Sequence, residues 1–128
     1  MITRRQALLL IPIFLLTAAA RRSTVHPTPR RGITSAKVLK PAQLTDVDPE
    51  VVRSFDMVRE IPHIIDGIFC HCGCADLPGH YSLLSCYEAD GMAQGCVVCQ
   101  GEARLAHRLY QRGSTLEQIR AAIDRDFG

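Results

Sequence analysis

The stretch "CVVCQGEARLAHRLYQRGSTLEQIRAAIDRDFG", residues 96–128, carries the clearest fold signal in the chain. Its first half predicts a helix with Val98, Leu105 and Leu109 on one side, ending at the cap residue Gly113. The sequence "STLE" at 114–117 then has the spacing of a capping box and predicts the start of a second helix. Apolar residues follow at helical intervals in that second helix: Leu116, Ile119, Ile123 and Phe127. Residues 96–128 therefore predict an αα-hairpin.

Helical signals continue toward the N-terminus of this hairpin. In "DVDPEVVRSFDMVRE", residues 46–60, Asp48 can cap a helix that has Pro49 at its first position. "PHIIDGIF", residues 62–69, predicts a second short helix beginning at its proline. "YSLLSCYEA", residues 81–89, predicts one or two helical turns. Because no stretch alternates like a strand, we expect a small all-α domain over residues 46–128, folded over cysteine-rich loops.

The first 20 residues resemble an export signal. Arg4 and Arg5 precede an apolar run from residue 7 to 20, which ends in small residues. The run is shorter than the ~20 residues that span a bilayer, so a cleaved signal peptide is favoured over a permanent anchor. The paired arginines leave two routes open, twin-arginine and general secretory. We expect an exported, periplasmic or extracytoplasmic protein that stays membrane-associated if the signal is uncleaved.

Residues 21–45 read as a basic flexible linker. They contain three prolines and no apolar period, and every acidic residue of the chain lies from Asp46 onward. From there 13 Asp and Glu face 7 Arg, so the domain carries a net charge of −6. An acidic domain without stacking aromatic residues is not expected to bind nucleic acid. Membrane contact is expected only through the signal or the basic linker.

Six cysteines are the candidate functional residues, and all lie within 30 positions: Cys70, Cys72, Cys74, Cys86, Cys96 and Cys99. An even number in a small exported domain fits a disulfide-stapled structural or interaction domain. The C-x-C-x-C spacing is awkward for disulfides and suits chelation better, because Gly73 lets neighbouring sulfurs turn toward one ion. Thiolates would hold a soft metal ion, copper(I) or zinc.

The histidines differ in how well their positions suit a metal ligand. His80 follows a flexible Pro-Gly pair and can fold back toward the cysteine loop, so it joins the six cysteines as a candidate ligand. His71 lies between two cysteines and points away from them in an extended segment. His26, His63 and His107 are expected to be ordinary surface or packing residues.

Cys96 and Cys99 also allow a redox interpretation. A C-x-x-C at a helix N-terminus is the arrangement in which one thiolate attacks a disulfide and its neighbour resolves the intermediate. Helix amide dipoles there are expected to lower the pKa of both thiols. Gln100 stands where haem attachment would need histidine. No other enzymatic constellation is visible, so any activity would be thiol-disulfide exchange by this pair.

Residues 61–102 resemble the exported bacterial proteins named for a PCYCGC motif, which are largely uncharacterised and often lipoproteins. "FCHCGC", "GHYSLLSCY" and "CVVCQGEA" carry the resemblance, with all six cysteines, Gly73, Gly79 and His80 in matching positions. The chain departs from the motif at Phe69 and His71, where the family has proline and tyrosine, and it lacks the lipid-anchor cysteine. The resemblance implies that the six cysteines and His80 act together.

Residues 96–128 are also similar to the thiol reductase subunit of cytochrome c maturation, with Cys96, Cys99 and Gln100 in matching positions. That similarity implies a small helical bundle with a redox role, but the other four cysteines are foreign to it. We therefore expect foremost an exported protein that binds copper or zinc for sequestration or delivery. A metal-receiving or redox protein is the expected partner. Thiol-disulfide exchange and a disulfide-stapled domain remain the alternatives.

Overall fold

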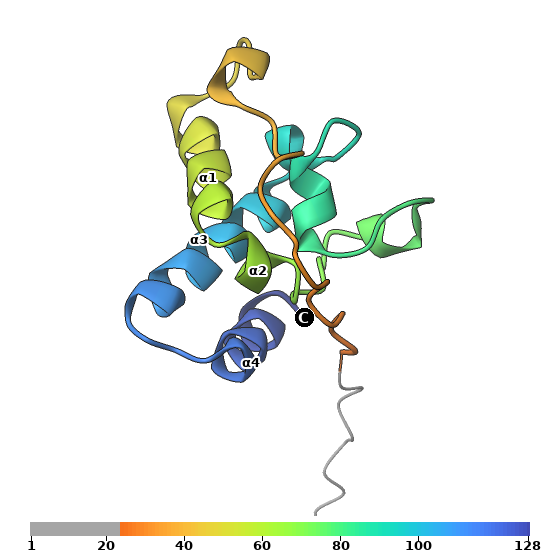
Figure 1. Cartoon of the computed structure of the whole chain (residues 1–128), viewed down its shortest axis with the longest axis vertical. Coiled ribbons are helices and arrows are strands. Elements are labelled where there is room, and N and C mark those ends of the chain that lie inside the picture. Colours follow the sequence, from red (N-terminus) through yellow and green to blue (C-terminus); the bar gives the residue numbers. More distant parts are fainter. Residues whose placement is uncertain (1–23) are drawn as a thin grey trace, which may run out of the picture.

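The computed structural model describes residues 24–128, and every regular element within them is helical (Figure 1). The α-helices are α1 (Pro49–Glu60), α2 (Pro62–Ile65), α3 (Val97–Gln111) and α4 (Leu116–Phe127). Short 3-10 helices lie between them at Pro41–Gln43, Cys74–Asp76, Leu83–Tyr87 and Ala93–Gly95. The expected all-α class is confirmed. Over this described part, no helix combines the length and apolar character needed to cross a membrane. The expected signal peptide, residues 1–20, lies outside the described residues.

The C-terminal hairpin forms as expected, with α3 packed against α4. Gly113 adopts a left-handed φ of 84°, and its N–H donates to Tyr110 O at 2.9 Å, so the carbonyls at the end of α3 find donors. The capping box begins one residue later than the sequence suggested: the Thr115 hydroxyl accepts from Gln118 N, and the Gln118 side chain accepts from Thr115 N. Thr115, and not Ser114, is therefore the residue that starts α4.

α1 crosses α3 and supplies the other wall of the core. The Asp48 carboxylate accepts from Glu50 N at 2.8 Å, and Pro49 opens the helix, as the sequence predicted. Phe55 and Val58 are fully buried on the inner face. The Phe55 and Tyr87 rings meet edge to face, and the 3-10 helix that holds Tyr87 also carries Cys86 and contacts both α1 and α3. The core is thus built around the segment that holds one of the cysteines.

Residues 24–45 differ from the expected flexible linker, because they pack along the domain (Figure 1). Val38 and Leu39 are 2% and 9% exposed and belong to the core. Leu39 N donates to Tyr87 O at 3.0 Å, and Arg30 binds the buried carboxylate of Asp66. Most of the polar contacts of this segment reach residues distant in the sequence, so no helical or alternating period marks its packing. Its apolar pair was therefore invisible to pattern reading.

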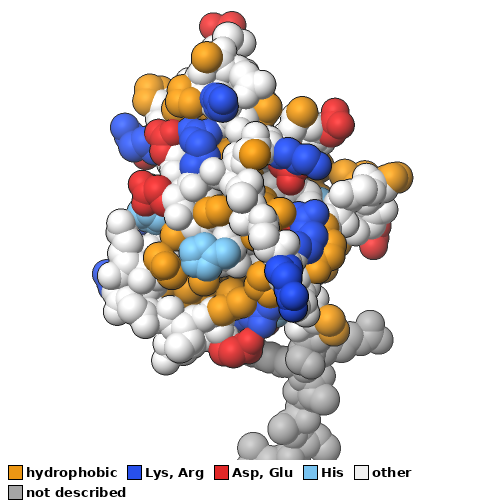
Figure 2. Space-filling model, in the orientation of Figure 1, with side chains coloured by type: hydrophobic (Ala, Val, Ile, Leu, Met, Phe, Trp, Pro, Cys, Tyr) orange, Lys and Arg blue, Asp and Glu red, His pale blue; other side chains and the backbone are white. Residues whose placement is uncertain are grey.

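The surface of the domain mixes charges of both signs with scattered apolar side chains on the face seen in Figure 2. Arg residues packed beside acidic ones account for part of this pattern, as in the pairs Arg53 with Glu50 and Arg59 with Asp56. Exposed pairs of this kind contribute little to stability.

Candidate metal centre

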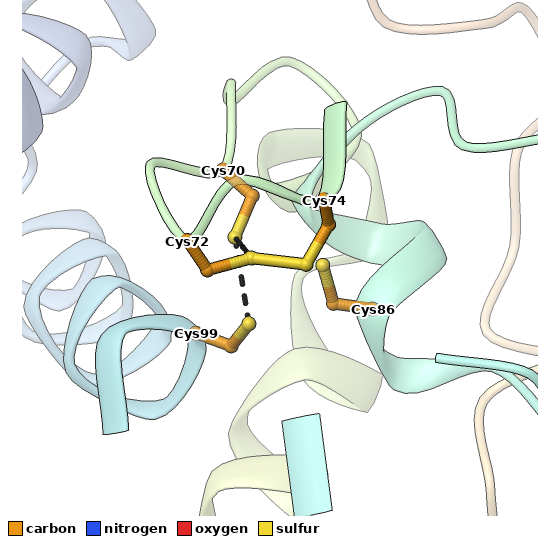
Figure 3. A group of neighbouring side chains, drawn as sticks. All are labelled: Cys70, Cys72, Cys74, Cys86 and Cys99. Carbon is orange, nitrogen blue, oxygen red and sulfur yellow. Dashed lines mark hydrogen bonds between the residues drawn. A yellow bond between two sulfur atoms is a disulfide. The ribbon is translucent and has the colours of Figure 1, made fainter. Parts of the chain in front are cut away.

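The loop between α2 and the helix at Leu83–Tyr87 carries three of the cysteines, and a glycine shapes it. Gly73 has a left-handed φ of 89° and turns the chain between Cys72 and Cys74. No atom lies within 4 Å of where a Cβ would stand on Gly73, so the requirement is one of backbone conformation and not of space. The turn brings Cys70, Cys72 and Cys74 to the same side of the loop (Figure 3). This is the bend that the sequence predicted at Gly73.

Five sulfur atoms converge beneath this loop. The Sγ atoms of Cys70, Cys72, Cys74, Cys86 and Cys99 all lie within 4.8 Å of one another (Figure 3). Four of the five residues are at most 2% exposed, and Cys72 is half-buried. Cys86 comes from the helix at Leu83–Tyr87, and Cys99 from the first turn of α3. The group can hold a metal ion, because closely spaced sulfurs in an apolar surrounding are the donors that soft ions prefer.

Cys72 and Cys74 are joined by a disulfide, whereas Cys70, Cys86, Cys96 and Cys99 are free thiols. We expected the C-x-C spacing to disfavour a bond, yet the turn at Gly73 holds the two Cα atoms 5.6 Å apart, an ordinary separation for a disulfide. The described residues thus contain one disulfide, not the three of a fully stapled domain. Reduction of this bond would leave five thiols in the same small volume.

Ionisation of one buried thiol in the group opposes ionisation of its neighbours. The pKa of Cys70 is lowered because Cys86 and then Cys99 donate hydrogen bonds toward its sulfur, with Cys99 Sγ at 3.4 Å. The pKa of Cys99 is raised by the same interaction with Cys70, and then by Cys86 and by burial. The expectation that the start of α3 lowers the pKa of Cys99 is therefore wrong, since a hydrogen-bonded neighbour that holds the charge outweighs the helix dipole.

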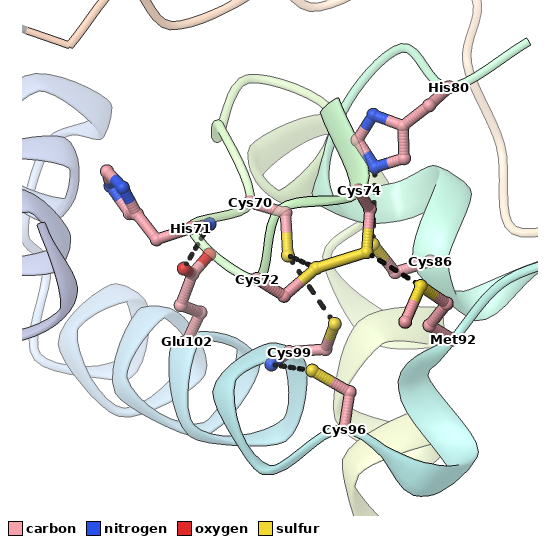
Figure 4. Close-up of a disulfide and its surroundings, with 10 residues drawn as sticks. All are labelled: Cys70, His71, Cys72, Cys74, His80, Cys86, Met92, Cys96, Cys99 and Glu102. Atoms are coloured by element: carbon pink, nitrogen blue, oxygen red, sulfur yellow. Dashed lines mark hydrogen bonds between the residues drawn. A yellow bond between two sulfur atoms is a disulfide. The ribbon is translucent and has the colours of Figure 1, made fainter. Parts of the chain in front are cut away.

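Two of the candidate ligands lie at the edge of the group (Figure 4). His80 Nε2 is 3.3 Å from Cys86 Sγ, and burial lowers the pKa of the imidazole, which favours the neutral form that can bind a metal. Cys96 lies outside the five sulfurs, and its Sγ accepts from Cys99 N at 3.4 Å as the N-cap of α3. The structure thus brings five of the six cysteines together and sets His80 beside them.

Met92 is a soft donor that the sequence reasoning missed. Its Sδ lies 3.1 Å from Cys74 Sγ, and its side chain is 47% exposed (Figure 4). A thioether is a ligand for copper(I). A single methionine in a loop has no spacing pattern, so only the fold reveals that it meets Cys74.

Glu102 on α3 is the second residue that the sequence reasoning did not single out. It is fully buried, and its Oε1 accepts from His71 N at 2.8 Å while Oε2 has no hydrogen-bond partner. Burial, together with the charges of Cys70 and Cys96, raises the pKa of this carboxyl to about 9. The neutral acid therefore holds the backbone of the cysteine loop against α3 (Figure 4).

His26 and His71 are bonded to other parts of the fold and are not ordinary surface residues. His71 Nε2 and His26 Nε2 lie 2.9 and 3.0 Å from the two carboxylate oxygens of Asp124 on α4. His26 Nδ1 also accepts from Phe69 N at 3.0 Å. The cysteine loop is thereby tied to the N-terminal segment and to α4. His107 pairs with Glu60, as suits a packing residue.

A cleft of about 540 Å³ opens beside the sulfur group. Among the residues lining it are Cys74, His80, Cys86 and Met92, and the rest come mainly from residues 36–39 and from 77–91. Cys70 and Cys99 do not line the cleft. Of the five cysteines, Cys74 and Cys86 therefore border this solvent-connected space, whereas Cys70, Cys72 and Cys99 do not line it.

Comparison with known proteins adds a family but no activity. The model of a family described as "Protein of unknown function with PCYCGC motif" matches residues 30–128. The match begins within the segment that packs on the domain, at the arginine that binds Asp66. No curated protein and no solved structure matches the chain.

Proposed function

Because the chain belongs to the PCYCGC-motif family, whose function is unknown, we propose a function from its own geometry: it is an exported protein that binds copper(I) through clustered thiolates. The observation that carries this proposal is the convergence of five sulfur atoms within 4.8 Å of one another. So dense a group exceeds what a small helical core needs from cysteine as a hydrophobic residue.

Copper(I) is favoured over zinc by the donor set. A structural zinc site takes four ligands and is closed by them. Here five sulfurs lie together, and the thioether of Met92 adds a sixth within 3.1 Å of Cys74 Sγ. Thioethers suit copper(I), and thiolates can serve either ion. His80 supplies an imidazole at the edge of the same group.

The reduced protein is the binding form. Cys72 and Cys74 cannot act as thiolate ligands while they are bonded to each other, so their disulfide must first be reduced. Each thiol that binds the ion then gives up its proton, so binding is favoured as pH rises. The bound ion would be a soft cation whose charge neutralises the thiolates in this apolar site.

The cellular role follows from the expected export signal at residues 1–20. An exported copper(I) protein would sequester the ion or deliver it to a metal-receiving partner protein. The segment from Arg30 to Lys40 carries basic side chains, including exposed Arg31 and Lys37, that suit contact with an anionic membrane surface. Export, partner and membrane contact are parts of this proposal.

The test is copper(I) binding by the reduced protein. The chain without residues 1–20 is reduced anaerobically with a phosphine and titrated with copper(I) against a chromophoric chelator. We expect retention of copper(I), with fewer ions held by Cys86→Ser and by Cys99→Ser. Cys96→Ser is the matched control and should retain the wild-type amount, since Cys96 lies outside the group. A wild-type protein that gives up all copper to a weak chelator would refute the proposal.

Thiol-disulfide exchange is the second candidate, and one distance favours it. Cys70 Sγ lies 3.1 Å from Cys72 Sγ of the disulfide. In contrast, the pair expected to carry this activity is poorly placed for it, because Cys99 is fully buried and Cys96 caps α3. Insulin reduction by the metal-free protein, with dithiothreitol as the electron donor that is oxidised to its disulfide, would measure this activity, and its loss in Cys72→Ser but not in Cys96→Ser would assign it to the loop.

A further inference from the structure

We propose that the cleft beside the sulfur group is the route by which copper(I) enters and leaves, and that Met92 is the exchange ligand that passes the ion to Cys74. This inference rests on the proposed copper(I) function and assigns the path that serves it. Met92 would hold the ion during transfer and would not belong to its final ligand set.

The sulfur donors become less exposed from the cleft toward the interior of the domain. Met92 is 47% exposed, Cys74 is 2% exposed, and the two sulfurs are 3.1 Å apart. Both residues line the cleft, together with His80 and Cys86. Cys70 and Cys99 are fully buried and lie beyond them. Soft donors thus continue from the solvent side to the interior without a gap (Figure 4).

The chemistry of a thioether suits the outer position. Met92 is neutral, so it binds copper(I) without losing a proton, and it binds more weakly than a thiolate. In the transfer the Cys74 thiol gives its proton to water as its sulfur bonds to the ion, and the bond to Met92 then breaks. The ion remains copper(I) throughout, so no electron donor or acceptor is needed.

The loop that carries Met92 is built to hold it at this place. A Cβ on the preceding residue, Gly91, would lie 2.2 Å from Cys86 O, so only glycine lets the chain pass this close. After Met92, the Gln100 side chain on α3 donates to Ala93 O at 2.7 Å. The methionine is therefore fixed against the cysteine segment from both sides, although its side chain reaches solvent.

The test is the rate of copper(I) withdrawal. Reduced wild-type protein, Met92→Leu and Met57→Leu are loaded with copper(I) and mixed in a stopped-flow instrument with excess bathocuproine disulfonate, which absorbs when it takes the ion. Leucine conserves the volume of methionine, so the fold should tolerate both changes. Met57 lies on α1 and does not line the cleft, so Met57→Leu is the matched control. Equal far-ultraviolet circular dichroism confirms that all three proteins are folded.

We expect Met92→Leu to release copper(I) about tenfold more slowly while it holds the wild-type amount at equilibrium, and Met57→Leu to match wild type in both. Unchanged release by Met92→Leu would overturn the inference and leave the copper(I) function standing, with access through the half-buried Cys72 instead. A lower equilibrium amount in Met92→Leu would overturn it as well, because Met92 would then be a permanent ligand. Wild-type protein that holds no copper(I) would overturn both proposals.

Discussion

Cys70 Sγ lies 3.1 Å from Cys72 Sγ, which is bonded to Cys74. Hydrogen bonds from neighbouring thiols, chiefly Cys86, lower the pKa of Cys70 and so favour the thiolate form that can attack a disulfide sulfur. Attack by Cys70 on Cys72 would form a new disulfide between them and release Cys74 as the thiolate. The exchange needs no outside oxidant, because one disulfide replaces another.

Air-purified protein should therefore contain two pairings, Cys72 with Cys74 and Cys70 with Cys72. Free thiols are blocked with one alkylating reagent at low pH, the disulfides are reduced, and a second reagent labels the released thiols before peptide fragmentation. We expect the first label on Cys74 in part of the wild-type population and on none of the Cys70→Ser protein. Cys96→Ser should behave as wild type. A single pairing in wild type contradicts this prediction.

Removing the Asp66 carboxylate and removing the Arg30 side chain should lower the free energy of unfolding by different amounts. Asp66 is fully buried and accepts from the backbone N–H, Nε and Nη2 of Arg30, whereas the Arg30 side chain is 41% exposed. Arg30→Ala would leave a buried carboxylate with Ser82 as its remaining side-chain donor and should cost about 3 kcal/mol of unfolding free energy. Asp66→Asn leaves an arginine that can reach water, so a smaller cost of roughly 1–2 kcal/mol is expected. Urea unfolding gives both values.

Arg31→Ala is the control for this pair, because its exposed side chain should change stability by under about 0.5 kcal/mol. The pH dependence supplies a second check. Burial acts to raise the Asp66 pKa, but hydrogen bonds from Arg30 and Ser82 outweigh it and leave the pKa lowered. Stability from this carboxylate is present above the unfolded pKa of about 4 and is lost as pH falls through the lower folded pKa. If Arg30→Ala and Asp66→Asn lower the free energy of unfolding equally at pH 7, the difference in burial between the two side chains does not decide the effect.

Glu102 should make the metal-free fold less stable as pH rises. Its folded pKa of about 9 exceeds the usual carboxyl value, so the folded state binds the extra proton between the two. The stabilising neutral form is fully present at low pH and is lost as pH rises through the folded value. Glu102→Gln mimics the neutral acid and keeps an acceptor for His71 N. The stability of the variant relative to wild type should therefore increase by about 1.4 kcal/mol for each pH unit within the window.

Urea unfolding of both proteins at pH 5, 7 and 8.5 measures this difference. Glu117→Gln on α4 is the control, since its side chain is 80% exposed. It should show no such trend with pH. A constant difference between wild type and Glu102→Gln across the three pH values would mean that the Glu102 carboxyl titrates as an exposed acid.

Asp124 should hold the cysteine loop closed against α4. Its two oxygens meet His26 Nε2 and His71 Nε2, and His26 in turn accepts from Phe69 N. Asp124→Ala removes two hydrogen bonds, each contributing about 1 kcal/mol. We expect amide hydrogen exchange over residues 69–72 to become about tenfold faster or more. Asp126→Ala is the control, because that exposed residue pairs with Arg125. Equal protection in both variants would leave the loop held by Glu102 alone.

The helices could be predicted because their signals are local. Asp48 with Pro49 starts α1, Pro62 starts α2, and Gly113 ends α3, each through the backbone of its own neighbourhood. The sequence also predicted that Cys70, Cys72 and Cys74 would converge with Cys86 and Cys99, because six cysteines within 30 positions of a small domain must lie close together. Helix starts and ends could be predicted from the sequence because the residues that form each of them lie within one or two helical turns of one another.

The remaining features depend on partners distant in sequence. Glu102 reads as a polar position of a helix, and only the loop packed on α3 turns it into a buried acceptor. Met92 becomes a candidate ligand because Cys74, 18 residues earlier, returns beside it. Cys96 was grouped with the other thiols by its C-x-x-C spacing from Cys99 and by the family resemblance, whereas its position at the N-cap directs its sulfur to the helix backbone. Spacing cannot report such contacts.

The path of residues 26–39 has a consequence for proteolysis. A basic stretch that contains prolines would, as a loose tether, be the first place for a trypsin-like protease to cut. Here the Arg30 N–H is held by Asp66, and the Leu39 N–H by Tyr87. A protease needs the backbone around Arg31 or Lys37 to enter its active site in extended form, which would first require those bonds to open. This segment should therefore survive digestion for as long as Arg30 stays bonded to Asp66 and Leu39 to Tyr87.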